Sequence, residues 1–303
     1  MFGASGKIGK HIANNLTSEK YDIRLFVSDR KKAEKMFGTG FEIFEGDLRL
    51  IADLQKGLVN IDGIFLNLSY GMFPNLEPEN ILEGLKNILV MARIQNLKQI
   101  IVQYPLVIDE LPGDQKNWMR FLLIQNAIQL IQNSGLDYTI LKTSLFMENF
   151  PERFQKGNIV DVPDKPEIFA YWLSALDLGK VAVRCFFNES VYKESIVVQG
   201  KERISLRSAA HQYVNGRKGL RLSGGGGNLL KLFSKFRLSE NDDQNGFDFF
   251  GIYEEKFIPE NRFDLLNHKF LSFQEFCQSG EGTDNKNNPG KTQREEHPNR
   301  VVL

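Results

Sequence analysis

Short apolar runs alternate with amphipathic stretches along the first half of the chain. The runs predict β-strands at 23–27, 63–68, 99–104 and 137–141. Apolar residues at helical spacing predict helices from Lys7 onward, around 81–92 and over 117–133. Strands that alternate with helices are typical of a parallel sheet covered on both faces. The pattern therefore predicts an α/β fold with a doubly wound, Rossmann-type parallel sheet.

The second half is less regular, and we expect a smaller lobe there. After about Phe146, strand-like segments remain only at 159–160 and 195–198, with a helix over 176–187 between them. We predict three parts: a nucleotide-binding domain over 1–150, a small discontinuous lobe over 151–278, and a tail over 279–303. Part of the lobe, 175–198, should return to the sheet. The tail is polar, which predicts disorder.

Charge and composition exclude several classes of protein. Lys and Arg number 38 and so do Asp and Glu, and no long basic block is present, so we expect neither a nucleic acid nor a membrane surface as partner. No apolar run is long enough to span a bilayer. Cys185 and Cys277 lie far apart, without metal-ligand spacing, so we expect no metal site. A reduced, cytoplasmic protein is the resulting expectation.

A glycine-rich turn opens the chain. Gly3, Gly6 and Gly9 have the spacing G-x-x-G-x-x-G. In a dinucleotide site such glycines form a tight turn, let the backbone approach the pyrophosphate, and let the helix pack closely on the sheet. The pyrophosphate would lie on N–H groups at the start of the following helix. We therefore predict cofactor contacts from the turn, at Gly3, Ser5, Gly6, Lys7, Ile8 and Gly9.

The end of the strand at 23–27 bears on the type of cofactor. NAD sites usually offer a carboxylate to the ribose 2′-hydroxyl, whereas NADP sites offer cations to the 2′-phosphate. Ser28 can donate a hydrogen bond and Arg30 can pair with a phosphate, so NADP(H) is favoured over NAD(H). Asp29 argues for NAD if it faces the ribose. Alternatively, Arg30 simply belongs to the solvated start of a helix.

Several separated stretches resemble one family. They are the Gly3–Gly9 turn, Gly46–Leu48, Gly84–Asn87, Ser134–Lys142 and Phe146–Phe150. In this order, and over about residues 1–277, the chain resembles the NmrA-like family of atypical short-chain dehydrogenases/reductases. The resemblance implies a Rossmann-type sheet that binds NAD(P)(H), with a small second lobe over the nicotinamide end.

The same resemblance implies positions for further site residues. Asp47 and Leu48 would lie beside the adenine. The ribose and pyrophosphate would be bordered by Leu68, Ser69 and Tyr70. Tyr104 and Pro105 would lie near the nicotinamide ribose, and the substrate side would be lined by Phe146 and Asn149.

The catalytic pair of short-chain dehydrogenases is missing from its expected place. That Tyr-x-x-x-Lys pair needs a helix, which puts both side chains on one face. The only match, Tyr138 to Lys142, lies in a predicted strand, where four residues span about 13 Å. The helix at 117–133 contains neither residue type. Tyr104 remains as a catalytic candidate, although a tyrosine at a strand end beside proline is more often a packing residue.

Three functions remain open. The first is a sensor or regulator whose bound dinucleotide shapes a surface for a protein partner. The alternative is an NAD(P)H-dependent oxidoreductase that reduces a small quinone or carbonyl compound, because hydride transfer to a quinone needs little from the protein beyond orientation. The third is a scaffold with an unused nucleotide site.

The start of the sequence raises a separate expectation. A Rossmann sheet begins with a central strand of about five residues before the first glycine. Only Met1 and Phe2 precede Gly3. We expect a gap with unpaired strand edges, and hence about three to eight further apolar residues before Met1 in the natural chain. The rival expectation is a truncated form with weakened cofactor binding.

Overall fold

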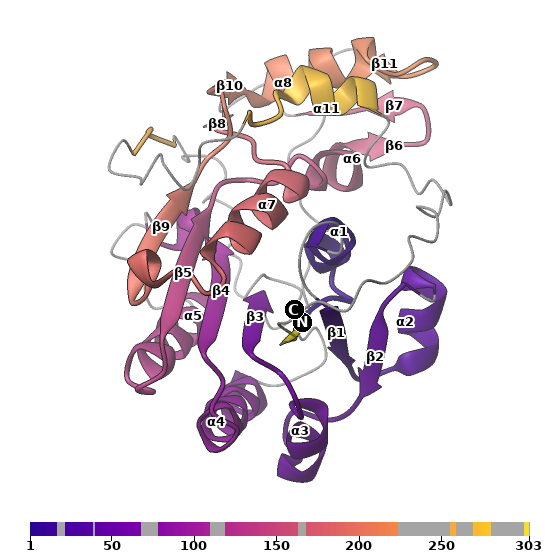
Figure 1. The fold of residues 1–303 in the computed structure, drawn as a ribbon. Coiled ribbons are helices and arrows are strands. Elements are labelled where there is room, and N and C mark those ends of the chain that lie inside the picture. The colour runs from indigo at the N-terminus through magenta and orange to yellow at the C-terminus, as the bar shows by residue number, and fades with distance from the viewer. Residues whose placement is uncertain are drawn as a thin grey trace.

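The computed structural model describes residues 1–16, 22–38, 40–67, 78–109, 119–162, 168–223, 255–258, 269–279 and 300–302. Figure 1 shows a twisted sheet with helices on both faces and a smaller layer of elements above it. The predicted α/β fold with a doubly wound parallel sheet is confirmed.

Seven parallel strands form the main sheet, in the order β2-β1-β12-β3-β4-β5-β9. Their bounds are β1 Asp22–Val27, β2 Glu42–Glu45, β3 Gly63–Asn67, β4 Gln99–Pro105, β5 Tyr138–Thr143, β9 Glu194–Val198 and β12 Arg300–Val302. Every residue of β3 is buried, as expected for a parallel strand covered on both faces. The strands predicted at 23–27, 63–68, 99–104, 137–141 and 195–198 correspond to β1, β3, β4, β5 and β9.

Helices cover the two faces of the sheet separately. The first face carries α1 Lys7–Leu16, α2 Arg30–Phe37 and α7 Ala175–Cys185, and the second carries α3 Ile51–Gly57, α4 Pro78–Ile94 and α5 Met119–Gln132. Each face has its own core, with Ile12, Leu25 and Val181 on the first and Leu54, Ile88 and Ile131 on the second. Both faces of the main sheet are therefore covered by packed helices.

The smaller lobe follows the carboxyl ends of β5 and β9 (Figure 1). It contains α6 Asn149–Phe154, β6 Gln155–Lys156, β7 Ile159–Val160, β8 Phe169–Ala170, β10 Ile204–Ser205, α8 Leu206–Asn215, β11 Arg221–Leu222 and α11 Phe273–Ser279. Two small sheets, β11-β7-β6 and β10-β8, hold it together. Short 3₁₀ turns at Leu106–Ile108 and Glu189–Val191 complete the described elements.

A buried carboxylate joins this lobe to the main sheet. Glu255 has no exposed surface. Its side chain accepts hydrogen bonds from Ser144 Oγ at 2.6 Å and Gln199 Nε2 at 2.6 Å, which follow β5 and β9 directly. The backbone N–H of Tyr171 donates to the same carboxylate at 3.1 Å. These hydrogen bonds reach residues that directly follow β5 and β9, so Glu255 fixes its segment over the strand ends.

The structure describes one segment of the stretch over 280–303, for which disorder is predicted: Arg300–Val302 forms β12 inside the main sheet. The expected gap between β1 and β3 is absent: β12 pairs with both strands, and Phe2 bridges Phe26 and Leu66 further along. Sequence patterns missed this strand because its partners lie far away in the chain.

Candidate cofactor site

The Gly3–Gly9 turn has the close packing that its glycines predicted. Gly3 has a positive φ of 84°, and the N–H of Gly6 donates to its carbonyl at 3.1 Å. The first helix, α1, starts directly afterwards, at Lys7. A Cβ on Gly9 would lie 1.9 Å from Gly3 O, so only glycine lets the helix approach the turn this closely.

Two residues anchor the turn in the sheet. Phe2 N–H donates to Phe65 O at 3.2 Å, and Asn67 N–H donates to Phe2 O at 3.4 Å. On the other side, Phe26 N–H donates to Met1 O at 3.1 Å. Met1 and Phe2 therefore lie between β1 and β3. They place Gly3 at the carboxyl edge of the sheet, where Rossmann folds bind their ligands.

The residues around this turn fit a dinucleotide. The N-terminus of α1 presents backbone N–H groups and a positive partial charge, which suit a phosphate. At the end of neighbouring β3, Asn67 is fully buried, and both polar atoms of its side chain lack a hydrogen-bond partner within the described part of the chain. Buried amides are normally paired, so a bound polar group would satisfy this one.

The end of β1 presents Ser28, Asp29 and Arg30, and all three are exposed. Asp29 is the N-cap of α2, and its carboxylate accepts the Lys32 N–H at 2.9 Å. Arg30 donates from Nη2 to Ile43 O at 2.6 Å, and its Nη1 lies 3.5 Å from Glu34 Oε1. The carboxylate at this strand end is therefore used within the helix cap.

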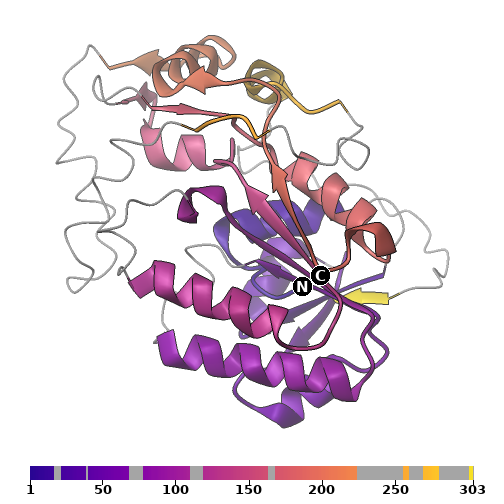
Figure 2. The same cartoon turned by 90° about the vertical axis from the view of Figure 1, so that its left-hand side faces the viewer.

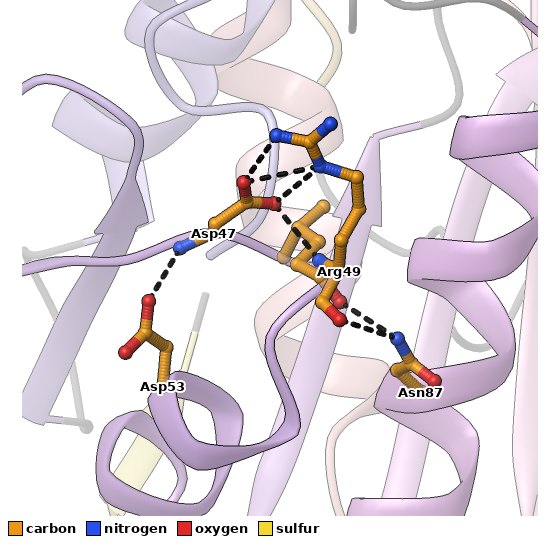
Figure 3. A network of polar contacts seen from close by, with 5 residues as sticks. Asp47, Arg49, Asp53 and Asn87 are labelled. Carbon is orange, nitrogen blue, oxygen red and sulfur yellow. Dashed lines mark hydrogen bonds and ion pairs between the residues drawn. The ribbon is translucent and has the colours of Figure 1, made fainter.

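The loop after β2 is held against α4 by polar contacts (Figure 3). Asn87 Nδ2 donates to Leu48 O at 3.2 Å and to Arg49 O at 3.3 Å. A Cβ on Gly84 would lie 3.0 Å from Leu48 Cβ. The structure thus brings together two stretches on which the family resemblance depends, Gly46–Leu48 and Gly84–Asn87.

Asp47 stands at the tip of this loop with two partners. Its N–H donates to Asp53 Oδ2 at 3.0 Å, and its carboxylate takes Arg49 Nη2 at 2.5 Å (Figure 3). The hydrogen bond from the Arg49 side chain is the main cause that lowers the pKa of Asp47 below its ordinary value. Asp47 is therefore an anion whose orientation is fixed by a forked pair with arginine.

A polar cluster occupies the carboxyl ends of β4 and β5. Tyr104 pairs in register with Lys142. The Tyr104 hydroxyl donates to Asp109 Oδ1 at 2.9 Å, and Lys142 Nζ lies 2.7 Å from Asp109 Oδ2. Burial, and then the charge of Asp109, raise the pKa of Tyr104 well above its ordinary value. This hydroxyl is thus a poor acid in the present arrangement.

Sequence reasoning missed two members of this cluster. Lys142 entered only as the end of an unsuitable Tyr138 pair, and Asp109 not at all. Adjacent parallel strands end at the same edge of the sheet. Tyr104 and Lys142 each lie at the end of an apolar run, and these two positions could have indicated that their side chains come close together. Asp109 follows a 3₁₀ turn, for which local periodicity gives no indication.

The predicted substrate-side residues have different surroundings. Phe146 is buried in the core on the α1 and α7 face. Asn149 is half-buried and begins α6. Leu68, Ser69 and Tyr70 lie outside the described residues. Asn149 is therefore the more accessible of the two substrate-side candidates.

The described residues include two cysteines, but no cluster of metal-ligating side chains. No group of three or more His, Cys, Asp or Glu side chains there could hold a metal ion. Cys185 and Cys277 are free and buried, and burial raises the pKa of each thiol to about 12. Among the described residues, no helix is long and apolar enough to cross a membrane.

Comparison with solved structures identifies the same fold in NADPH-dependent enzymes. Triphenylmethane reductase from Citrobacter sp., complexed with NADP(H), has a TM-score of 0.68 at 14% identity, over 91% of this chain and 97% of that one. The quinone oxidoreductase QOR2 from Escherichia coli, complexed with NADPH, has a TM-score of 0.65 at 16% identity, again over 91% and 97%. At these identities the likeness concerns the fold.

Curated relatives have other roles by name. Prestalk A differentiation protein A of Dictyostelium discoideum is 24% identical over 212 residues, which cover 68% of this chain and 64% of the relative. Photosystem II assembly factor Ycf39 of Guillardia theta is 22% identical over 211 residues, or 66% and 64%. The chain thus spans about 64% of the length of these relatives.

A family profile described as NAD(P)H-binding matches residues 3–189, which run from the first glycine of the turn through α7. The match covers more than half of the chain and shows that the chain belongs to the NAD(P)H-binding family.

Proposed function

We propose that the chain binds NADPH in preference to NADH and acts as a cofactor-dependent regulator rather than as a dehydrogenase. When bound, the dinucleotide would supply a hydride donor at the carboxyl edge of the sheet. The observation that carries the proposal is the commitment of the Tyr104 hydroxyl to Asp109, together with a helix α5 that contains neither tyrosine nor lysine.

The preference for NADPH is supported by the end of β1. The Asp29 carboxylate caps α2, so we infer that it does not bind the 2′-hydroxyl of the ribose. Ser28 is an exposed donor, and Arg30 is an exposed cation beside the same strand end, although its guanidinium donates to Ile43 O and lies near Glu34, from which a phosphate would have to draw it. A carboxylate there would repel a 2′-phosphate, whereas a guanidinium pairs with it through two hydrogen bonds.

Calorimetry on Arg30→Ala tests this preference. The ratio of the NADH to the NADPH dissociation constant should fall at least fivefold, about 1 kcal/mol. The ratio is the useful quantity because any damage to the shared turn affects both cofactors and cancels. Lys35→Ala, in the last turn of the same helix, is the matched control and should leave the ratio unchanged. An unchanged ratio in Arg30→Ala would remove the assignment to NADP.

The regulatory role is supported by the raised pKa of Tyr104 at the carboxyl edge of the main sheet. A dehydrogenase tyrosine must give up its proton to the substrate, and a raised pKa opposes that transfer. Tyr104 is 3% exposed, and its hydroxyl points to an aspartate. The two curated relatives, a differentiation protein and an assembly factor by name, are consistent with a role in controlling a partner.

A reductase of small quinones is the second candidate. It is favoured by Lys142, whose side chain is 25% exposed and whose ammonium group lies beside Asp109 at the strand ends, where it could orient an acceptor oxygen. The solved neighbours include a quinone oxidoreductase and a dye reductase. A quinone takes its proton from water, so an acidic tyrosine is not required.

One assay separates the two candidates. NADPH oxidation is followed at saturating cofactor against a panel of quinones and aldehydes, for the parent protein, Lys142→Met and Tyr104→Phe. The regulator should show NADPH binding without turnover above the uncatalysed rate. A quinone rate that Lys142→Met lowers tenfold or more and Tyr104→Phe leaves unchanged would instead establish the reductase.

A further inference from the structure

Two buried amide side chains are neighbours at the carboxyl ends of β3 and β4. Asn67 pairs in register with Gln103, and neither residue has any exposed surface. Adjacent strands are about 4.8 Å apart, and residues that pair in register project to the same face of the sheet. We refer to Asn67 and Gln103 as the amide pair.

The amide pair and the Tyr104 cluster lie on opposite faces of the sheet. Side chains alternate along a strand, so Asn67 and Gln103 share the face of Phe65 and Ile101, which pack in the core beneath α1 and α7. Tyr104 packs in the core of the other face. Figures 1 and 2 show α7 and α5 on opposite sides of β4 and β5. The amide pair is therefore separate from the polar cluster described above.

Three polar atoms of the amide pair have no hydrogen-bond partner among the described residues: Asn67 Nδ2, Asn67 Oδ1 and Gln103 Oε1. A threonine of β5 fixes the orientation of the Gln103 amide. Gln103 Nε2 donates to Thr143 Oγ1 at 2.7 Å, and this hydroxyl donates its single proton to Tyr104 O at 3.4 Å. Thr143 can therefore only accept from Gln103, and the open atom of Gln103 is its carbonyl oxygen, an acceptor.

The amino end of β4 carries a completed version of the same arrangement. Gln99 Nε2 donates to Thr139 Oγ1 at 2.9 Å, as Gln103 donates to its own threonine on β5. There the protein satisfies the rest of the amide: Nε2 also donates to Cys185 O at 3.0 Å, and Oε1 accepts the Phe187 N–H at 2.7 Å. No group in the described part of the chain does this for Gln103 Oε1. A bound ligand could complete it.

The course of a dinucleotide over the sheet leads to the amide pair. The Gly3–Gly9 turn starts between β1 and β3, and Phe2, directly before it, accepts the Asn67 N–H at 3.4 Å. We assign the adenine half of the cofactor to the β1 side of this turn, near Ser28 and Arg30. A dinucleotide crosses the crevice at the carboxyl edge, so its other half extends over β3 and β4.

We propose that the amide pair receives the carboxamide group of the bound nicotinamide. A primary carboxamide has one acceptor oxygen and two N–H donors, which match one unpaired donor and two unpaired acceptors. Asn67 Nδ2 would donate to the carboxamide oxygen, and the two N–H groups would donate to Asn67 Oδ1 and Gln103 Oε1. Because the pair is fully buried, entry of the ring requires the groups above it to move aside.

This inference rests on the cofactor binding proposed above. It does not depend on the preference for NADPH, because NADH carries the same carboxamide.

The test compares NADP⁺ with its acetylpyridine analogue, in which a methyl group replaces the amide nitrogen. The analogue keeps the carbonyl oxygen and loses both N–H donors. Calorimetry gives the two dissociation constants, and any damage to the glycine turn cancels in their ratio. The parent protein should bind the analogue about tenfold more weakly than NADP⁺, since two buried hydrogen bonds are lost.

Asn67→Leu and Gln103→Met replace each amide by an apolar side chain of similar volume. Both variants should weaken NADP⁺ binding about fivefold or more and lower the ratio about threefold or more. Adenosine 2′,5′-bisphosphate, which carries only the adenine end, should bind the parent and both variants equally. Gln99→Met is the matched control on the same strand and face, and it should leave the ratio unchanged.

Stability separates a ligand site from a structural pair. An amide without a partner is unfavourable in the cofactor-free protein, so Asn67→Leu should melt no lower than the parent. Gln99→Met breaks hydrogen bonds that the protein itself completes, and it should lower the melting temperature by about 3 °C or more.

The ratio decides the outcome. If it is unchanged in both Asn67→Leu and Gln103→Met, the proposal is overturned, and a lower melting temperature beside it would assign the amides a structural role. An equal change of the ratio in Gln99→Met would also overturn it. A parent protein that binds no dinucleotide would refute the proposed function itself, whereas a parent that binds NADP⁺ and the analogue equally would refute only the carboxamide site.

Discussion

At the scale of single residues, the site depends on places where a side chain cannot fit. Gly9 is the clearest, since its Cβ would overlap the carbonyl of Gly3 at 1.9 Å. Backbone cannot yield as a flexible side chain does, so the helix or the turn must move. Overpacking of this kind typically costs about 1–3 kcal/mol.

We therefore expect Gly9→Ala to lower the free energy of unfolding by about 1–3 kcal/mol and to weaken NADPH binding at least tenfold. Urea unfolding and calorimetry measure the two effects. Gly40→Ala is the control, because the nearest atom to its Cβ is Phe37 O at 3.9 Å. If Gly9→Ala binds NADPH as the parent does, the turn is not the pyrophosphate site.

The residue types in the sequence predicted the glycine turn well, but they gave little indication of the polar cluster at the carboxyl ends of β4 and β5. The glycines at 3, 6 and 9 are informative because a backbone shape demands them. Asp109 and Lys142 carry no such local signature, and only the register between β4 and β5 brings Lys142 beside Tyr104. Asp29 could be read as a ribose ligand from its place in the sequence, whereas its hydrogen bond with Lys32 N–H, which caps α2, depends on the helix that follows.

At the scale of elements, α11 shows how a short helix is fixed by its first turn. Ser272 Oγ accepts the Glu275 N–H at 3.1 Å, and Glu275 Oε2 accepts the Ser272 N–H at 2.8 Å, which is a capping box. Lys269 Nζ lies 3.1 Å from the same carboxylate. The backbone hydrogen bond from Ser272, followed by Lys269, lowers the pKa of Glu275 to about 2.

A lowered pKa of an acid stabilises the folded state only where the carboxylate is charged. We expect Glu275→Gln to be less stable than the parent at pH 7, and the difference to vanish as the pH falls from about 4.5 through about 2. Ser272→Ala should cost about 1 kcal/mol at pH 7. Part of this cost should also disappear at low pH, because the Ser272 hydroxyl donates to the Glu275 carboxylate at 2.9 Å and helps to lower its pKa. Urea unfolding at a series of pH values measures both; a difference that persists at pH 2 would contradict the capping box.

Helices and strands were easier to predict where the sequence pattern that indicates them lies within the element itself. The buried runs of β3, β4 and β5 are continuous and apolar, and helices α1, α5 and α7 begin within two residues of their predicted starts. The three-residue β12 has no such pattern, since only its partners in β1 and β3 define it.

At the scale of the whole molecule, an aromatic cluster joins the elements of the smaller lobe. The ring of Phe150, which has no exposed surface, lies 5.0 Å from Tyr213, 5.3 Å from Phe273 and 5.9 Å from Trp172. These rings come from α6, α8, α11 and the segment before α7. One side chain thus holds together parts of the chain that are far apart in sequence.

Phe150→Ala should lower the free energy of unfolding by about 3–5 kcal/mol, since it removes a fully buried ring from a contact shared by several elements. Phe257→Ala is the comparison, because Phe257 is 47% exposed and should cost no more than about 0.5 kcal/mol. Urea unfolding followed by both fluorescence and far-UV circular dichroism measures the change. Equal losses in the two variants would mean that the cluster is not a shared core.

The position of β12 also sets the order of events during synthesis. Ribosomes add about 5–20 residues per second and release the chain from its N-terminus. The glycine turn emerges first, whereas Arg300–Val302 is the last described strand to emerge, and it must insert between β1 and β3. Nascent chains would therefore hold a main sheet without β12 until Arg300–Val302 has been synthesised, although β1 and β3 on either side of it were made long before.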